Sequence, residues 1–209
     1  AAAAFPSLQL LPGAEAVATK LQCNVGGGCF PHHYDNAGPP SRRRLTCLFY
    51  LNPGWCEGDG GELLLSPWLR PPVRVAPCNG RLVLFLSDTI LHRVLPSRRL
   101  RFCFTIWLDG SGTNSKAALQ LDARKACDSA LLLDPAQRLL SRAVYAEAYA
   151  ASIRECFADQ PEQCADMLAS HDAHVAQSMA NPALARLVNG TREKLRELDH
   201  QPASSQPLA

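Results

Sequence analysis

The feature that most limits how this chain can fold is a change in the spacing of its apolar residues near residue 110. Before that point, short apolar runs alternate with clusters rich in Gly, Pro, Asn and Asp, such as NAGPPS (36–41) and NPGWCEGDGG (52–61). Many short strands separated by turn signals indicate an antiparallel sandwich or barrel. The first half of the chain is therefore expected to be all-β.

After about residue 116 the pattern becomes helical, because Ala, Leu, Arg, Glu and Gln dominate and turn residues are scarcer. The apolar residues of 136–157 recur at the three- and four-residue spacing of one long helix. Asp134 and Pro135 suit its N-cap and first turn. Two more helices are expected at 164–180 and 182–198. The predicted class is α+β, a β core followed by a C-terminal helical region.

Composition limits the kinds of partner and compartment. A net charge of +2 gives no reason to expect a nucleic-acid partner, and no apolar run of about 18 residues predicts a membrane span. The nine cysteines are scattered without a Cys-x-x-Cys pair, which favours reduced thiols over a disulfide between Cys156 and Cys164. We therefore expect an intracellular protein of the cytoplasm, or of an organelle matrix or stroma if a transit peptide has been removed.

The string HHYD (32–35) raises the question of a metal site. In a strand, residues two apart point to the same side, so His33 and Asp35 project together while His32 faces away, as a rim residue. His92 is the other histidine of the β half and follows an apolar strand and a turn. Two histidines and a carboxylate form the facial triad of non-haem iron(II) oxygenases. The alternative is ordinary surface hydrogen bonding, which is also expected for His171 and His174 on a solvated helix face.

Arg101 stands at the head of the apolar run RFCFTIWL, nine residues after His92. A buried arginine needs an anionic partner, and a dicarboxylate co-substrate would supply one. The alternative is a solvent-exposed arginine at a strand edge. Alternation places Thr105 on the same face as Arg101, and Tyr50 on the same face as Thr46.

In this order, His33-x-Asp35, His92 and Arg101 resemble the 2-oxoglutarate- and iron(II)-dependent dioxygenases. The strings LTCLFYLN, GDGGELLL, GRLVLFLSDTILHRVLPS and RFCFTIW are similar to the prolyl 4-hydroxylase branch, including the oxygen-sensing prolyl hydroxylases, over about residues 20–110. Trp107 occupies the place where the nucleic-acid repair branch has a second arginine, which argues against that branch.

The resemblance implies a double-stranded β-helix (jelly-roll) core and a site for each cofactor. His33, Asp35 and His92 would hold Fe(II). Arg101, Tyr50 and Thr105 would bind 2-oxoglutarate. A co-substrate-contacting tyrosine that many relatives have near CNVGGGCF is absent here, and Asn24 or Gln22 would stand near its place. The implied activity is hydroxylation of a protein or peptide substrate at prolyl residues with O2, with ascorbate as a candidate reductant.

The expected organisation has three parts: a lead-in at 1–19, the oxygenase core at 20–112 and a helical extension at 113–209. Members of the family cover their larger sheet with helices that precede the His-x-Asp motif, whereas about thirty residues precede it here. A hydrophobic sheet face must be buried, so we expect the C-terminal helices to cover part of it. The alternative function is an oxygenase-like subunit of a larger assembly, held through these helices, with little or no activity.

Overall fold

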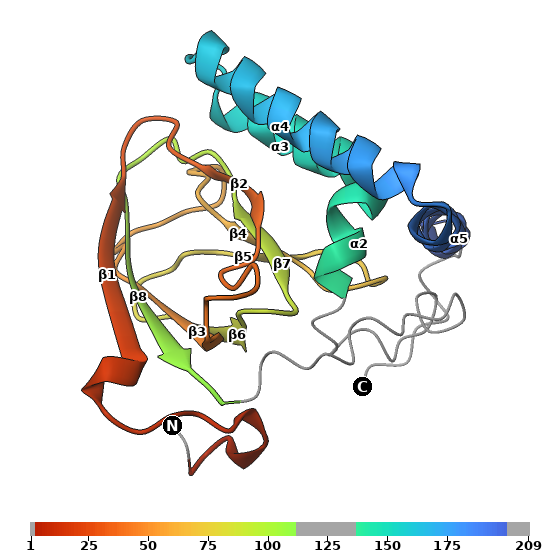
Figure 1. The fold of residues 1–209 in the computed structure, drawn as a ribbon. Coiled ribbons are helices and arrows are strands. Elements are labelled where there is room, and N and C mark those ends of the chain that lie inside the picture. Colours follow the sequence, from red (N-terminus) through yellow and green to blue (C-terminus); the bar gives the residue numbers. More distant parts are fainter. Residues whose placement is uncertain (1–2, 112–136, 200–209) are drawn as a thin grey trace.

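Two four-stranded antiparallel sheets form the first part of the computed structural model, which describes residues 3–111 and 137–199 (Figure 1). One sheet has the order β1-β8-β3-β6 and the other β2-β7-β4-β5. Two short 3-10 turns, Pro6–Leu8 and Ala14–Ala16, precede them. The strands are β1 Val17–Asn24, β2 Phe30–His33, β3 Arg43–Tyr50, β4 Leu63–Ser66, β5 Val73–Val75, β6 Leu82–Leu86, β7 Leu91–Val94 and β8 Arg101–Asp109.

The inner faces of the two sheets enclose an apolar cluster. Its buried members are Leu48, Tyr50, Leu63, Phe85, Val94 and Cys103. Each comes from a strand in which every second residue faces inward, which is the alternation seen in the sequence. The predicted α+β class, with an antiparallel β half followed by helices, is therefore confirmed.

The helical half begins, within the described residues, at Gln137. Its helices are α2 Gln137–Val144, α3 Ala146–Cys156, α4 Pro161–Ala180 and α5 Pro182–Asp199. None of these described helices is both long and apolar enough to span a membrane. The predicted start at Asp134 and Pro135, and the proposed boundary at 112/113, lie outside the described residues.

The prediction of one long helix over 136–157 is wrong, because the helix breaks at Tyr145. The Tyr145 hydroxyl accepts a hydrogen bond from the Leu69 backbone N–H at 3.1 Å. Its ring meets Trp68 edge-on, with 5.7 Å between ring centroids. Trp68 and Leu69 are buried among residues of α2 and α5. The chain therefore turns at Tyr145 to follow a surface that periodicity along one helix does not encode.

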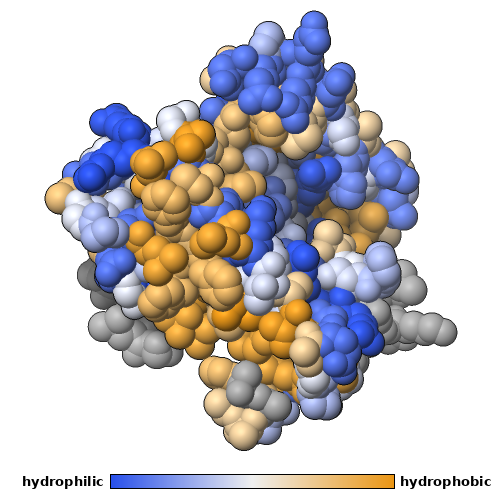
Figure 2. Space-filling view, turned by 90° about the vertical axis from the view of Figure 1, so that its left-hand side faces the viewer, coloured by the Kyte–Doolittle hydropathy of each residue, from blue (hydrophilic) through white to orange (hydrophobic). Residues whose placement is uncertain are grey.

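The described helices α2 to α5 do not cover the β1-β8-β3-β6 sheet, part of which the C-terminal helices were predicted to cover. Helix α3 packs on β2, and Figure 1 shows the helices on the β2-β7 side, away from β1 and β8. Leu21, Leu82 and Leu84, on the outer face of the β1-β8-β3-β6 sheet, are 68%, 56% and 43% exposed. Figure 2 shows this side of the molecule as a broad hydrophobic surface. The prediction is wrong because apolar spacing identifies a buried helix face but not the sheet it contacts.

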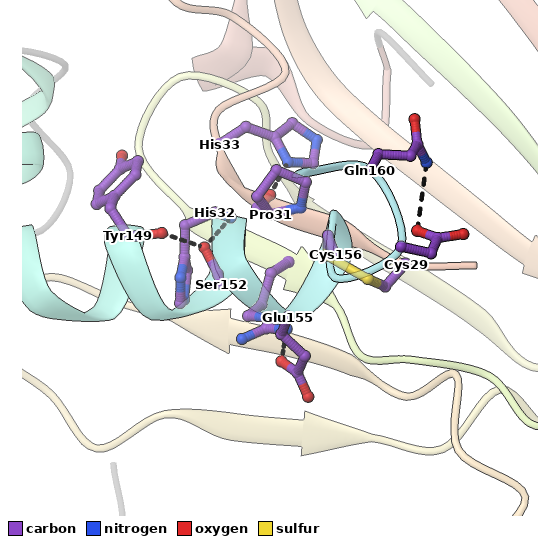
Figure 3. The surroundings of a disulfide bond; sticks show 11 residues. Cys29, Pro31, His32, His33, Tyr149, Ser152, Glu155, Cys156 and Gln160 are labelled. Atoms are coloured by element: carbon purple, nitrogen blue, oxygen red, sulfur yellow. Dashed lines mark hydrogen bonds and ion pairs between the residues drawn. A yellow bond between two sulfur atoms is a disulfide. The ribbon is translucent and has the colours of Figure 1, made fainter. Parts of the chain in front are cut away.

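Two cysteines that were expected to be reduced form a disulfide. Cys29, just before β2, is bonded to Cys156 at the end of α3, with 5.5 Å between their Cα atoms (Figure 3). Cys164, the partner considered from the sequence, is free. The two bonded residues are 127 positions apart, so local spacing gave no signal for this pair.

Candidate metal and co-substrate site

Three side chains from two paired strands and the loop after β2 converge at one end of the sandwich. His33 and His92 face each other across the β2-β7 pair, with 4.3 Å between ring centroids. The Asp35 Oδ1 atom lies 3.6 Å from His33 Nε2 and 3.7 Å from His92 Nε2. One ligand atom from each residue lies within 4.8 Å of the others. This donor set can hold one divalent ion and leaves other coordination positions free.

Both imidazoles are oriented through their second nitrogen. His33 Nδ1 lies 2.9 Å from the Pro31 carbonyl oxygen, and His92 Nδ1 lies 3.1 Å from that of Ile90. A carbonyl accepts only, so each Nδ1 carries the proton and each Nε2 keeps a free lone pair. Burial and the neighbouring His33 lower the pKa of His92 to about 4. His92 is therefore neutral at neutral pH, which is the form that binds metal.

Asp35 stays ionised although it is largely buried. Burial alone would raise its pKa, but interactions with His33 and His92 hold the pKa well below the usual carboxyl range. Its second oxygen, Oδ2, accepts a hydrogen bond from Thr46 Oγ1 at 2.7 Å. The Thr46 hydroxyl lies 2.8 Å from Ser87 Oγ, and both residues are fully buried. This chain fixes the carboxylate so that Oδ1 points toward the two histidines.

We expect Thr46→Val to weaken metal binding while the fold persists. Valine keeps the shape of threonine but removes the hydrogen bond that orients Asp35. Loss of a hydrogen-bond partner of a metal ligand typically reduces metal affinity by about 10- to 100-fold. The measurement is a Co(II) titration without oxygen, followed by visible absorption. Thr19→Val, on the exposed part of β1, is the matched control. Equal affinity in both variants would contradict the role assigned to Thr46.

Arg101 lies buried at the start of β8, with 2% exposure. Its Nε donates to the Gly61 carbonyl oxygen at 2.7 Å, and its two terminal nitrogens lie 3.4 Å from Asn24 Oδ1 and from Tyr50 Oη. Among residues 3–111 and 137–199, no carboxylate forms an ion pair with it. A buried charge without a counter-ion is costly, so this arrangement fits an anion supplied by a ligand.

Gly61 permits the close approach of Arg101. It has φ +75°, and a Cβ at this position would lie 2.8 Å from Arg101 Cδ and 2.9 Å from Ser97 Oγ. Any other residue would therefore clash with the arginine side chain as well as strain the backbone.

Tyr50 and Thr105 line the same interior as Arg101. Burial raises the pKa of Tyr50 to about 12, although Arg101 acts in the opposite direction, so the hydroxyl keeps its proton. Because Arg101 donates to Tyr50 Oη, the Tyr50 O–H can itself donate to a bound carboxylate. Thr105 is buried on the Arg101 face of β8, opposite Leu48 of β3. Asn24, named as a stand-in for a missing tyrosine, contacts Arg101, and Gln22 donates to Asn24 at 3.0 Å.

Two histidines lie in places that the sequence analysis did not predict. His32 was expected at the rim, but it is 9% exposed and lies under α3, 3.3 Å from the Ala148 carbonyl oxygen through Nδ1. His171 was expected in solvent, but it is 2% exposed and stacks on Tyr149. His174 is exposed as predicted. Both corrections have one cause: α3 lies against each side chain, over His32 of β2 and beside His171 of α4, and neither strand alternation nor helical spacing reveals that contact.

We expect the metal-free protein to lose stability between pH 6.5 and pH 4, in part through His32. Burial and the nearby Arg93, with a smaller effect of His33, lower the pKa of His32 from 6.5 to about 4. Within this window the unfolded chain binds a proton that folded His32 does not. This stability is therefore complete above pH 6.5 and is lost as the pH falls to 4. Urea unfolding followed by circular dichroism should show a shallower pH dependence for His32→Gln. An unchanged slope would contradict the assignment.

Residues that the sequence analysis did not assign complete the site. Thr46 and Ser87 hold Asp35, and Gly61 holds Arg101. Alternation placed Thr46 on the face of Tyr50, which was a usable signal. Ser87 and Gly61 lie in connections between strands, where alternation has no meaning, so they could not be found in that way.

Comparison with known proteins agrees with this geometry. Residues 19–109 match the model of the 2OG-Fe(II) oxygenase superfamily. A solved prolyl 4-hydroxylase structure from Phytophthora capsici is 44% identical, with a TM-score of 0.82, and the match covers 94% of this chain and 68% of that one. The chain belongs to the 2OG-Fe(II) oxygenase superfamily, in its prolyl hydroxylase branch. The cofactors of this family are iron(II) and 2-oxoglutarate, and the His-Asp-His cluster suits the first.

Curated relatives match a smaller region. The hypoxia-inducible factor prolyl hydroxylase of Caenorhabditis elegans is 34% identical over 119 residues, which are 55% of this chain and 16% of that protein. Prolyl hydroxylase EGLN3 of Mus musculus is 35% identical over 91 residues, which are 42% of this chain and 38% of that protein. The chain thus spans well under half the length of these two relatives.

Proposed function

We propose that this chain is an iron(II)- and 2-oxoglutarate-dependent dioxygenase that hydroxylates prolyl residues of a protein or peptide. The observation that carries the proposal is the buried guanidinium of Arg101, which has no carboxylate partner among the described residues and lies inside the same sandwich that bears the His-Asp-His cluster. A metal site alone would fit many proteins. A metal site together with a buried anion receptor fits a co-substrate that is both a chelator and a carboxylate.

Each proposed role follows from the atoms available. His33 Nε2, Asp35 Oδ1 and His92 Nε2 would hold the iron, which when bound supplies the activation of O2. Arg101 would bind the distal carboxylate of 2-oxoglutarate through its terminal nitrogens, Tyr50 would donate its hydroxyl proton, and Thr105 would add a polar contact. Ascorbate would serve as the reductant. The protein's own contribution is to hold the iron and 2-oxoglutarate, to orient them toward the substrate and to exclude water.

The two sheets are proposed to be the double-stranded β-helix of the family. The strand orders β1-β8-β3-β6 and β2-β7-β4-β5 support this, because eight antiparallel strands in these two orders make the double Greek key of a jelly roll. We also propose the division into a lead-in at 1–19, a core at 20–112 and a helical extension at 113–209. Placement in the cytoplasm or an organelle stays a prediction, and the Cys29–Cys156 bond makes it worth testing, since disulfides persist mainly in oxidising compartments.

The test is a turnover assay on proline-containing peptides. Purified protein is incubated with Fe(II), 2-oxoglutarate, O2 and ascorbate, and both succinate and the mass gain of one oxygen atom on the peptide are measured. We expect the two products in equal amounts, and neither without 2-oxoglutarate. Hydroxylation at residues other than proline would refute the substrate class while leaving the reaction type intact. No succinate with any peptide would favour the alternative, an inactive subunit of an assembly held through the helices.

A further inference from the structure

Helix α3 is attached to β2, which carries His33, and to the neighbouring strand β7 by one covalent bond and two polar contacts. The disulfide joins Cys29 to Cys156 (Figure 3). The His32 backbone N–H donates to Ser152 Oγ at 3.1 Å. On the neighbouring strand β7, the buried Arg93 forms an ion pair with Glu155 of α3. All three attachments come from the last turns of the helix.

Strand β2 has little support of its own. It has four residues, lies at the edge of its sheet and pairs with β7 alone, and the register shifts between Phe30 and His33. A short edge strand has few backbone hydrogen bonds to fix the direction of its side chains. The His32 N–H, which has no second strand to meet, is instead satisfied by Ser152, and Ser152 in turn donates to the Tyr149 carbonyl oxygen at 2.7 Å. The helix thus does for β2 what a neighbouring strand would do.

We infer that helix α3 holds β2 in place, a role called the splint below. Cys29, Cys156 and Ser152 are then positioning residues for the metal ligand His33. Cys29 lies four residues before His33, and Ser152 holds the residue directly before it. With the splint released, His33 would sample directions away from Asp35 and His92, and metal affinity would fall. The inference rests on the metal site proposed above and gives the helical extension a part in that site.

It follows that metal affinity depends on the redox state of this disulfide. A dithiol would deliver two electrons: the sulfur–sulfur bond breaks, Cys29 and Cys156 each gain a proton as thiols, and the dithiol closes to its own disulfide. No other group of the protein needs to change for this step.

The test compares Co(II) affinity without oxygen, by visible titration, in four samples. These are the wild-type protein, the double variant Cys29→Ser/Cys156→Ser, the control Cys164→Ser, and wild type reduced with a dithiol and then desalted. Cys164 is a free cysteine on α4. We expect roughly 10-fold weaker Co(II) binding in the double variant and in the reduced protein, because groups that orient a metal ligand have effects of this size. The visible spectrum of bound Co(II) should also change, because His33 would no longer be held in position as a ligand. The control should bind Co(II) as the wild type does.

The possible outcomes separate the splint from the proposed function. Absence of Co(II) binding in the wild type would refute the metal site itself. Wild-type affinity in both the double variant and the reduced protein would refute the splint alone. If circular dichroism shows that those samples are unfolded, Ser152→Ala decides, because it keeps the disulfide and removes the acceptor of the His32 N–H. In that variant, weaker Co(II) binding supports the splint and unchanged binding overturns it.

Discussion

Replacing His92 with alanine is expected to abolish metal binding and turnover while the β-sandwich persists. His92 is 4% exposed and supplies one of three converging ligand atoms, 3.7 Å from Asp35 Oδ1. Outer-shell changes alone cost 10- to 100-fold in metal affinity, so loss of a direct ligand should cost at least about 100-fold. The measurement is the visible absorption band that Fe(II) and 2-oxoglutarate form as a chelate without oxygen, followed by succinate production in air.

The control for this experiment is His174→Ala. His174 is exposed on α4, so its loss should leave both the band and succinate production unchanged. A band that survives His92→Ala would show that this residue is not a ligand. No band in the wild-type protein would reject the enzyme hypothesis as a whole.

Arg101→Gln is expected to separate co-substrate binding from metal binding. Hydrogen bonds to charged groups contribute about 1.5–3 kcal/mol each, so losing a two-pronged contact with a carboxylate should weaken 2-oxoglutarate binding by about 100-fold or more. Co(II) affinity should stay within about threefold of wild type, because the three ligand atoms lie on other strands and loops. Calorimetric titration of each component gives the two affinities.

The same substitution also predicts a change in thermal stability, which can be measured without turnover. In the wild type a buried positive charge lacks an ion-pair partner among the described residues, and 2-oxoglutarate would supply one. Bound co-substrate should therefore raise the melting temperature of the wild type, and this increase should vanish in Arg101→Gln. Arg99→Gln, at an exposed arginine two residues earlier, is the control. If Arg101→Gln still gains stability from 2-oxoglutarate, the carboxylate binds elsewhere.

The sequence predicted the side of β2 that bears the metal ligand His33, but it did not predict the surroundings of the opposite side, which bears His32. Alternation selected His33 and Asp35, because residues two apart in a strand share a side, and His92 was chosen as the other histidine of the β half. The structure brings these three residues together. Alternation also sent His32 away from the site. It could not say that a helix covers that opposite side, which is why a buried histidine was taken for a rim residue.

The features that were missed depend on contacts between distant parts of the chain. The Cys29–Cys156 bond joins the β half to the helical half, and the apolar pattern of one half does not tell which surface of the other half it contacts. The break at Tyr145 follows from Leu69 and Trp68, whose position depends on the sheets. Local periodicity identifies which residues are apolar together. It does not identify which surfaces meet, because that is decided by packing of the whole domain.

The contact between Gly61 and Arg101 limits how this protein can evolve. A methyl group at position 61 would overlap the arginine side chain, and the backbone there adopts a conformation that favours glycine. A first mutation at either position therefore harms the same function before any second mutation can compensate. Lineages that keep the arginine are expected to keep the glycine, and a descendant in which both have changed has most simply given up 2-oxoglutarate. A related sequence that keeps both the glycine and the arginine is therefore expected to keep 2-oxoglutarate binding.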